Sequence, residues 1–337
     1  MKSCTALVLI TVLLAAACGA NSAEPTRRGF LVYTRDLNSS RQAVWIARVD
    51  GTHARLLVRQ GLFGALSPDG RWVAYNRCLA SRTRCELGNA PFALFVIATS
   101  GGKPRLLARS TSYPSWSPRS DRIVALRKGA LVSLDLDGDV RLLERDPALA
   151  GWSVSPDGRS VVYAKARQHT KCDSDLFVVR TTGGDPRRIT RGRDIFPIWG
   201  PHAIAFSRYP KSCAYARRIW RVRPDGSGAQ QVTATPPESS RLGMYYGFDP
   251  IGWAPNERTL LAGLATEWGA EAIRLDATTG AYRRLSGYAV SLSRDGRTAL
   301  VQSGGVEGPQ TIAAVRISDG RRRVLAHGDV AFPSWNR

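Results

Sequence analysis

The sequence predicts an all-β fold, a β-propeller of seven four-stranded blades, from three observations: a recurring turn motif, a constant order of strands between its copies, and complementary incomplete repeats at the two ends. The motif reads Ser-Pro-Asp-Gly-Arg or a partial copy of it, and it follows a short apolar run. Its copies are anchored at Leu66, Trp116, Val154, Trp199, Trp253, Leu292 and Trp335. Successive anchors lie 38 to 54 residues apart, and a turn signal fixed within such a period is typical of repeat architectures.

Each repeat has the same internal order. Two short β-rich runs follow the motif, such as Trp72–Tyr75 and Leu94–Ile97, and then comes a tight turn such as Gly101-Gly102, whose residues tolerate positive φ. A third run begins with a basic residue, as in Arg105–Leu107, and the apolar run before the next motif is the innermost strand of the following sheet. Four short strands per repeat make propeller blades, which leave only short, protected sheet edges.

The two ends of the chain complement each other. The first repeat has three predicted strands, over residues 30–34, 43–49 and 55–58, and lacks an innermost strand. The last repeat consists of one innermost strand, over residues 330–335. We therefore expect the two ends to complete one blade together, which gives seven blades, with six as the alternative count.

The Trp-Ser-Pro-Asp-Gly pattern resembles that of the TolB-type, WD-repeat-like propellers of bacterial envelope proteins, over roughly residues 29–337. The resemblance implies the propeller fold, and it says less about function because propellers of this type also occur in peptidases and scaffolds. TolB itself carries a separate α/β domain before a six-bladed propeller. Here only residues 19–28 separate the signal region from the first strand, so we expect no role in the Tol–Pal system.

The N-terminus is predicted to direct export. Residues 1–17 resemble a signal peptide, and Leu14-Ala-Ala-Ala-Cys18-Gly19 resembles a bacterial lipobox that would make Cys18 the lipidated residue. Residues 18–28 would then be a tether and 29–337 the propeller domain. We expect a lipoprotein of the cell membrane, anchored by its lipid and facing the periplasm or the outside. The alternative is ordinary cleavage after Ala17, which would release a soluble secreted protein.

Four cysteines remain in the predicted mature domain, and an even number in an exported protein favours disulfides. Cys78 and Cys85 share one predicted loop, while Cys172 and Cys213 occupy the same loop in two consecutive repeats. We therefore predict the pairs Cys78–Cys85 and Cys172–Cys213. Their spacing does not match a zinc site, so no metal is expected.

The chain is strongly basic, with a net charge of +21 from 48 Lys and Arg against 27 Asp and Glu. Behind an export signal this charge points to anionic lipids, acidic envelope polymers or an acidic envelope protein, and not to nucleic acid. Much of the excess is assigned to solvated outer strand edges, where charge blocks edge-to-edge pairing. The runs concerned are Arg187-Arg188, Arg283-Arg284 and Arg321-Arg322-Arg323.

No catalytic motif is apparent. The chain has no Gly-x-Ser-x-Gly, and no paired carboxylates are identifiable by motif. We therefore predict a non-catalytic, monomeric propeller without a cofactor. The alternative is a glycan-active hydrolase or lyase with its site at the central channel.

The long insertions all fall on one face of the predicted propeller, over residues 76–91, 165–174, 207–217, 234–249 and 304–309. Loops on a rigid scaffold are frequent carriers of function, and aromatic residues mixed with Arg are common interface anchors. We predict that an envelope protein or acidic polymer binds this long-loop face. The candidate residues are Arg82, Arg84, Lys211, Arg217, Tyr245, Tyr246 and Trp268.

Overall fold

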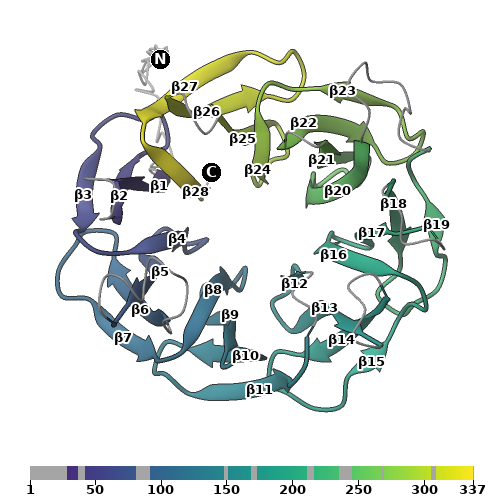
Figure 1. Cartoon of the computed structure of the whole chain (residues 1–337), viewed down its shortest axis with the longest axis horizontal. Coiled ribbons are helices and arrows are strands. Elements are labelled where there is room, and N and C mark those ends of the chain that lie inside the picture. Colours follow the sequence, from purple (N-terminus) through teal and green to yellow (C-terminus); the bar gives the residue numbers. More distant parts are fainter. Residues whose placement is uncertain are drawn as a thin grey trace, which may run out of the picture.

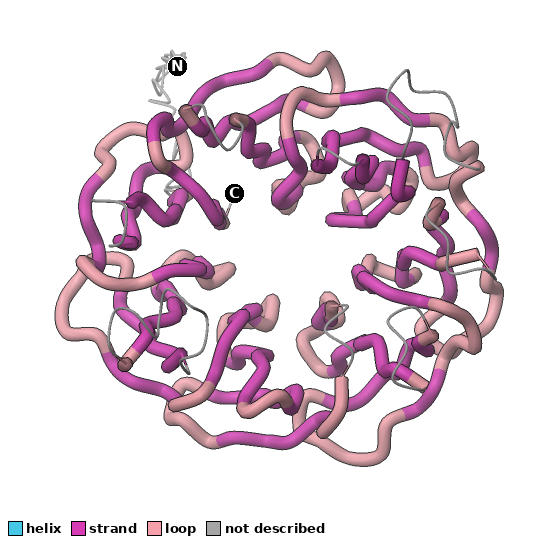
Figure 2. The backbone as a smooth tube through the Cα atoms, in the orientation of Figure 1, coloured by secondary structure: helices cyan, strands magenta, loops and turns pink. Residues whose placement is uncertain are grey.

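The computed structural model describes residues 29–36, 42–80, 92–147, 151–167, 173–210, 216–234, 245–266, 269–304 and 309–336. These residues form seven four-stranded antiparallel sheets arranged as blades around a central axis (Figure 1). The described part contains strands and loops but no helix (Figure 2). It therefore offers no helix that could cross a membrane. The all-β prediction is confirmed.

We label the blades A to G in chain order and name the innermost strand first. Blade A consists of β28 (Val330–Trp335), β1 (Phe30–Asp36), β2 (Gln42–Arg48) and β3 (Arg55–Val58). Blade B consists of β4 (Leu62–Leu66), β5 (Trp72–Cys78), β6 (Phe92–Ala98) and β7 (Arg105–Ala108). Blade C consists of β8 (Thr111–Trp116), β9 (Arg122–Arg127), β10 (Ala130–Asp135) and β11 (Val140–Glu144).

The remaining four blades follow the same order. Blade D consists of β12 (Trp152–Val154), β13 (Ser160–Ala166), β14 (Ser174–Arg180) and β15 (Arg187–Arg188). Blade E consists of β16 (Asp194–Trp199), β17 (Ile204–Arg208), β18 (Arg218–Val222) and β19 (Gln230–Gln231). Blade F consists of β20 (Tyr245–Trp253), β21 (Thr259–Thr266), β22 (Gly269–Asp276) and β23 (Tyr282–Arg284). Blade G consists of β24 (Tyr288–Leu292), β25 (Thr298–Ser303), β26 (Gln310–Arg316) and β27 (Arg322–Gly328).

The two ends of the chain share blade A, as predicted. Strand β28 pairs with β1 in a register that places Leu31 opposite Trp335 and Arg35 opposite Val330. The Phe30 amide also donates to Oδ1 of Asn336 at 2.7 Å. The sheet order β28-β1-β2-β3 confirms seven blades and excludes the alternative of six.

The recurring Ser-Pro-Asp-Gly motif forms a self-contained turn. Ser67 Oγ donates to Oδ1 of Asp69 at 2.6 Å, and the same carboxylate oxygen accepts the Arg71 amide at 3.0 Å. The Trp72 amide in turn donates to Ser67 Oγ at 2.9 Å. Equivalent bonds occur in blades D and G, at Ser155–Ser160 and Ser293–Thr298. The aspartate therefore holds the backbone of the turn, which is the role that its recurrence predicts.

The hydrophobic core lies between the blades. Successive side chains of a strand point to opposite faces of its sheet, so each middle strand contributes to two neighbouring cores. In β1, Leu31 and Tyr33 pack with Leu300 of blade G, whereas Val32 packs with Val73 of blade B. This double burial explains why the middle strands read as continuous apolar runs.

Arginines at the outer strands connect neighbouring blades. Arg323 Nη2 donates to the Asp50 carbonyl at 2.9 Å and joins blade G to blade A. Arg187 joins blade D to blade E through the carbonyls of Pro224 at 2.7 Å and Asp225 at 2.8 Å. Similar bonds run from Arg55 to Thr99 and from Arg283 to Ile317. Arg187, Arg283 and Arg323 are exposed, as predicted for outer strand edges, and their guanidinium groups also donate to turn carbonyls of the next blade.

Candidate functional site

The innermost strands are interrupted by a β-bulge near the ring axis. In β28, Phe332 and Pro333 together oppose a single residue of β1, between the pairs Thr34–Ala331 and Val32–Ser334. The same irregularity involves Phe63-Gly64 in β4, Tyr113-Pro114 in β8 and Phe196-Pro197 in β16. Proline is tolerated here because a bulge leaves one residue outside the hydrogen-bond ladder.

The first residue of these bulges adopts a left-handed backbone conformation. The φ angles are 54° for Phe63, 55° for Tyr113, 51° for Phe196 and 50° for Phe332. A residue other than glycine in this region costs on the order of 1–3 kcal/mol. Blade D has Gly151 at the equivalent place, with φ of 94°. A glycine can therefore occupy this position with positive φ, and four blades place an aromatic residue there instead.

Three of these aromatic side chains form a continuous surface across blades A, B and C. The Phe63 ring lies 4.6 Å from Phe332 and 5.6 Å from Tyr113, measured between ring centroids. Tyr113 is 55% exposed and Phe332 is 44% exposed. The strands that carry these side chains are the innermost strands of their blades and surround the axis of the ring (Figure 1). We call Phe332, Phe63 and Tyr113 the aromatic row.

A basic residue occupies one fixed position on the second strand of five consecutive blades. The strand register places Arg35 opposite Val330, Arg127 opposite Thr111 and Arg208 opposite Asp194. The residues that share this position are Arg35, Arg77, Arg127, Lys165 and Arg208, in blades A to E. Since all five lie toward the long-loop end of the strand, they surround one mouth of the ring.

Only two of these five cations have a carboxylate partner within the described ranges. Lys165 Nζ lies 3.0 Å from Glu144, and Arg208 binds both oxygens of Asp194. In blades A to C, Arg35 stacks over the Trp45 ring at 5.4 Å, Arg77 donates to Gln60 at 3.1 Å, and Arg127 Nε is buried without a partner in the described structure. The uncompensated positive charge therefore lies in the same three blades as the aromatic row.

The buried ionisable groups nearby are poor candidates for proton transfer at neutral pH. Burial raises the pKa of Tyr75 to about 12, against a smaller opposing effect of Arg77. Burial also raises the pKa of Tyr163, and its hydrogen bond to Glu144 raises it further. Burial opposes ionisation of Glu144, but hydrogen bonds from Lys165, the Asp146 amide and Tyr163 together hold its pKa below the ordinary value. These groups keep one protonation state, which suits a structural role, between blades A and B for Tyr75 and between blades C and D for Tyr163 and Glu144.

The structure places only part of the predicted partner-binding set. Arg217 is paired with Asp249 at 2.6 and 2.9 Å, and its guanidinium lies 5.4 Å from the Tyr209 ring. Its side chain is only 11% exposed. Tyr245 and Tyr246 belong to β20, and their side chains are not described. Arg82, Arg84, Lys211 and Trp268 lie outside the described residues, so the partner-binding surface stays a prediction.

Of the cysteines named in the predictions, only Cys78 lies in the part of the chain that the structure describes. Cys78 ends β5 and is disulfide-bonded. Cys18, Cys85, Cys172 and Cys213 lie outside the described residues. Lipidation of Cys18 and both disulfide pairings therefore stay predictions.

No metal centre can be assembled from the part of the chain that the structure describes. It contains no group of three or more His, Cys, Asp or Glu side chains that could hold a metal ion.

The aromatic row and the basic positions were missed by the sequence analysis, which followed the tryptophan anchors. A signal was present three residues before the anchors, where Tyr113-Pro114, Phe196-Pro197 and Phe332-Pro333 repeat an aromatic-proline pair. Arg77, Arg127 and Lys165 each follow their anchor by 11 residues, which was a second signal, whereas Arg208 follows Trp199 by nine and needed the strand register.

Comparison with known proteins identifies similar folds. No protein-family model matches the chain. An uncharacterized protein of Agrobacterium fabrum (strain C58 / ATCC 33970) is 28% identical over 145 residues, which are 41% of this chain and 45% of that protein. The match thus spans less than half the length of that relative.

Three solved structures illustrate the range of similar propellers. An oligogalacturonate lyase in complex with manganese has a TM-score of 0.59 at 15% identity, over 87% of this chain and 83% of that one. TolB from Acinetobacter baumannii has a TM-score of 0.54 at 14% identity, over 91% and 82%. A prolyl endopeptidase has a TM-score of 0.64 at 15% identity, over 90% of this chain but 49% of that one.

These comparisons correct the functional prediction. The prediction of a non-catalytic binding propeller is contradicted, because the similar structures include a lyase and an endopeptidase beside TolB. At these identities the likeness shows the fold alone and leaves the activity to be argued from the site. By fold, this chain is a seven-bladed β-propeller that is similar to the solved TolB structures.

Proposed function

We propose that this protein is an exported carbohydrate-active propeller that takes an acidic oligosaccharide at its ring axis and cleaves it. One observation carries the proposal: the exposed aromatic row lies in the same three blades as Arg35, Arg77 and Arg127, which have no carboxylate partner in the described structure. Aromatic platforms and unpaired guanidinium groups together suit a ligand with flat apolar faces and negative charge.

The chemistry of a uronate chain fits both features. Its pyranose rings present apolar C–H faces that pack on aromatic rings, and its carboxylates accept paired hydrogen bonds from guanidinium groups. Phe332, Phe63 and Tyr113 belong to three adjacent blades and lie in contact. The row therefore suits an extended ligand of more than one sugar unit.

The similar structures favour this ligand class. An oligogalacturonate lyase shares the fold over 87% of this chain. A second one, from Vibrio parahaemolyticus, does so with a TM-score of 0.57 at 12% identity. Their named substrate is an acidic oligosaccharide, and we extend only this substrate class to the present chain.

The proposed cleavage is a β-elimination, which needs a group that transfers protons and cations that neutralise the carboxylate of the uronate. A base removes the proton on the carbon next to the uronate carboxylate, the electrons form a carbon–carbon double bond, and the glycosidic oxygen leaves with a proton. Guanidinium groups on the carboxylate make that first proton more acidic. The Tyr113 hydroxyl is the protonatable group of the aromatic row, so we assign both proton transfers to it. Its phenolate form takes the proton from the carbon and then gives that proton to the glycosidic oxygen as the bond to this oxygen breaks, while Arg77 and Arg127 neutralise the carboxylate.

The proposal is tested by mixing the purified full chain with oligogalacturonate and following the ultraviolet absorbance of the unsaturated product. We expect turnover by the wild type, and a loss of about a hundred-fold or more in kcat for Tyr113→Phe, in line with the contribution of a general acid or base. Phe196→Ala is the matched control, since Phe196 is exposed at the same bulge position of blade E. Absence of product from oligogalacturonate and from other uronate oligomers would overturn the assignment.

Export rests on the predicted signal at residues 1–17, and anchoring rests on Cys18. A site for an envelope polysaccharide agrees with that location, because acidic glycans occur outside the cytoplasm. The anchoring proposal is tested separately, as given in the Discussion.

A further inference from the structure

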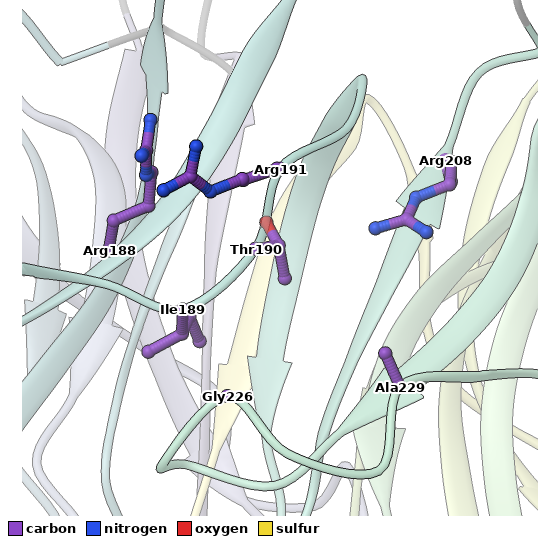
Figure 3. Close-up of a pocket in the computed structure, with 7 residues that line it drawn as sticks. All are labelled: Arg188, Ile189, Thr190, Arg191, Arg208, Gly226 and Ala229. Atoms are coloured by element: carbon purple, nitrogen blue, oxygen red, sulfur yellow. The ribbon is translucent and has the colours of Figure 1, made fainter.

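A pocket of about 400 Å³ opens between blades D and E, away from the aromatic row. It is lined by Arg188, Thr190, Arg191 and Arg208 together with small or apolar residues, and no acidic side chain is among the lining residues. In Figure 3, Arg188 and Arg191 lie on one side and Arg208 lies on the other, with Thr190 between them. Three guanidinium groups from two blades thus face one space.

Arg208 is held in a fixed orientation. Its Nε and Nη2 donate to the two oxygens of Asp194 at 2.6 and 2.9 Å, and Asp194 is fully buried. The guanidinium also lies over the Trp220 ring at 4.4 Å and near the Phe206 ring at 5.2 Å. Among the described contacts, these leave Nη1 of Arg208 available for a ligand.

Arg188 is positioned by a second buried carboxylate. Its Nη1 lies 3.4 Å from Asp175, which is fully buried and also accepts the Gly192 amide at 2.9 Å. Arg167 shares the same carboxylate at 3.6 Å. A single bond at this length leaves most of the N–H groups of Arg188 free to bind a ligand.

Arg191 is exposed and makes no hydrogen bond or ion pair within the described structure. Figure 3 shows its side chain extending beside that of Arg188. Two like charges held together repel each other, and an anion between them relieves that repulsion. The pocket therefore combines two preorganised guanidinium groups with a third whose charge is not compensated.

We propose that this pocket binds the phosphate group of a phosphate monoester. A tetrahedral dianion accepts hydrogen bonds in several directions, which matches guanidinium groups on opposite sides of the pocket better than a planar carboxylate does. The Thr190 hydroxyl accepts the Leu176 amide at 2.9 Å and can donate its own proton to a phosphate oxygen. The site lies at the blade D–E junction, and its lining includes none of the residues proposed for cleavage, Arg77, Tyr113 and Arg127.

The proposal is tested by calorimetric titration of the full chain with glycerol 3-phosphate and with inorganic phosphate, in a phosphate-free buffer of low ionic strength. A second arm measures co-sedimentation with phosphatidylcholine vesicles with and without phosphatidic acid, which carries the same group on a lipid. Saturable binding in the first arm identifies a soluble ester, and binding only to phosphatidic acid vesicles identifies a lipid source.

Arg191→Gln is the decisive variant, because Arg191 contributes no described contact to the fold. We expect binding to weaken about ten-fold or more, since hydrogen bonds to a charged group are worth that much, with an unchanged melting temperature in the absence of ligand. Arg109→Gln is the matched control, because Arg109 is an exposed arginine directly after the outermost strand of blade B. Binding that is absent in both arms, or equal for wild type and Arg191→Gln, would overturn the proposal.

Discussion

The ring of Phe63 packs edge-on against the ring of Phe332, at 4.6 Å between centroids and an interplanar angle of 63°. These residues come from the beginning and the end of the propeller, and they meet because β28 closes blade A beside β4. The aromatic row therefore exists only in the closed ring. Closure is a requirement of the proposed site as well as of the fold.

The variant Tyr113→Gly distinguishes a role of the aromatic row in turnover from a role in the stability of the fold. Glycine adopts the positive φ of this position at little cost, and the 55% exposed side chain gives up little packing. We expect the free energy of unfolding to stay within about 1 kcal/mol of the wild type while oligogalacturonate turnover is lost. Urea denaturation and the product assay measure the two effects. A large destabilisation would show that the aromatic side chain serves the fold.

The contact between Arg323 and the Asp50 carbonyl should stabilise ring closure. Arg323→Ala removes the 2.9 Å bond between blades G and A, and we expect a loss of about 1 kcal/mol. Arg321→Ala is the control, because Arg321 belongs to the same basic run and its side chain has no described bond. Equal unfolding midpoints for the two variants would show that the inter-blade bond adds nothing.

Glu144 should make the ring sensitive to acid. Its pKa is held below the ordinary value by Lys165, the Asp146 amide and Tyr163, although burial opposes this. A carboxyl with a lowered pKa contributes stability above its ordinary pKa, and the contribution is lost as the pH falls through the folded-state value. Glu144→Gln should cost roughly 1–3 kcal/mol near neutral pH and less under acidic conditions. Unfolding free energies measured from neutral to acidic pH give the difference, and a pH-independent gap would refute this role.

Cys18 is predicted to fix the protein to a membrane. Cys18→Ser should lack an acyl group and move to the soluble or secreted fraction, provided that the alternative cleavage after Ala17 occurs. Mass spectrometry of the N-terminal peptide and membrane fractionation test this. Identical partitioning of wild type and variant, with no acyl mass, would exclude an anchor at Cys18.

The fold could be predicted because its signals are local and repeated. The Ser67–Asp69 turn bonds involve neighbouring residues, and the pairing of Val330–Trp335 with β1 follows from a repeat that lacks its first strand. The aromatic row could not be predicted in the same way. In the sequence, Phe63-Gly64 and Tyr113-Pro114 look like ordinary strand residues, and only the strand register shows that each pair forms a bulge. The bond of Arg323 to the Asp50 carbonyl could not be predicted either, because Asp50 lies almost a full chain length away.

The proposed function depends most directly on the interaction between an acidic oligosaccharide and the arginines of the blades that carry the aromatic row, Arg35, Arg77 and Arg127. Calorimetric titration of the full chain with oligogalacturonate, compared with a neutral oligosaccharide of similar length, measures it directly. We predict binding of the acidic ligand only, weakened by added salt and by about ten-fold or more in Arg77→Gln. Arg71→Gln, which changes an 80% exposed arginine at the opposite end of β5, should leave it unchanged. Equal affinity for the neutral ligand, or full affinity in Arg77→Gln, would contradict the proposed acidic-oligosaccharide site.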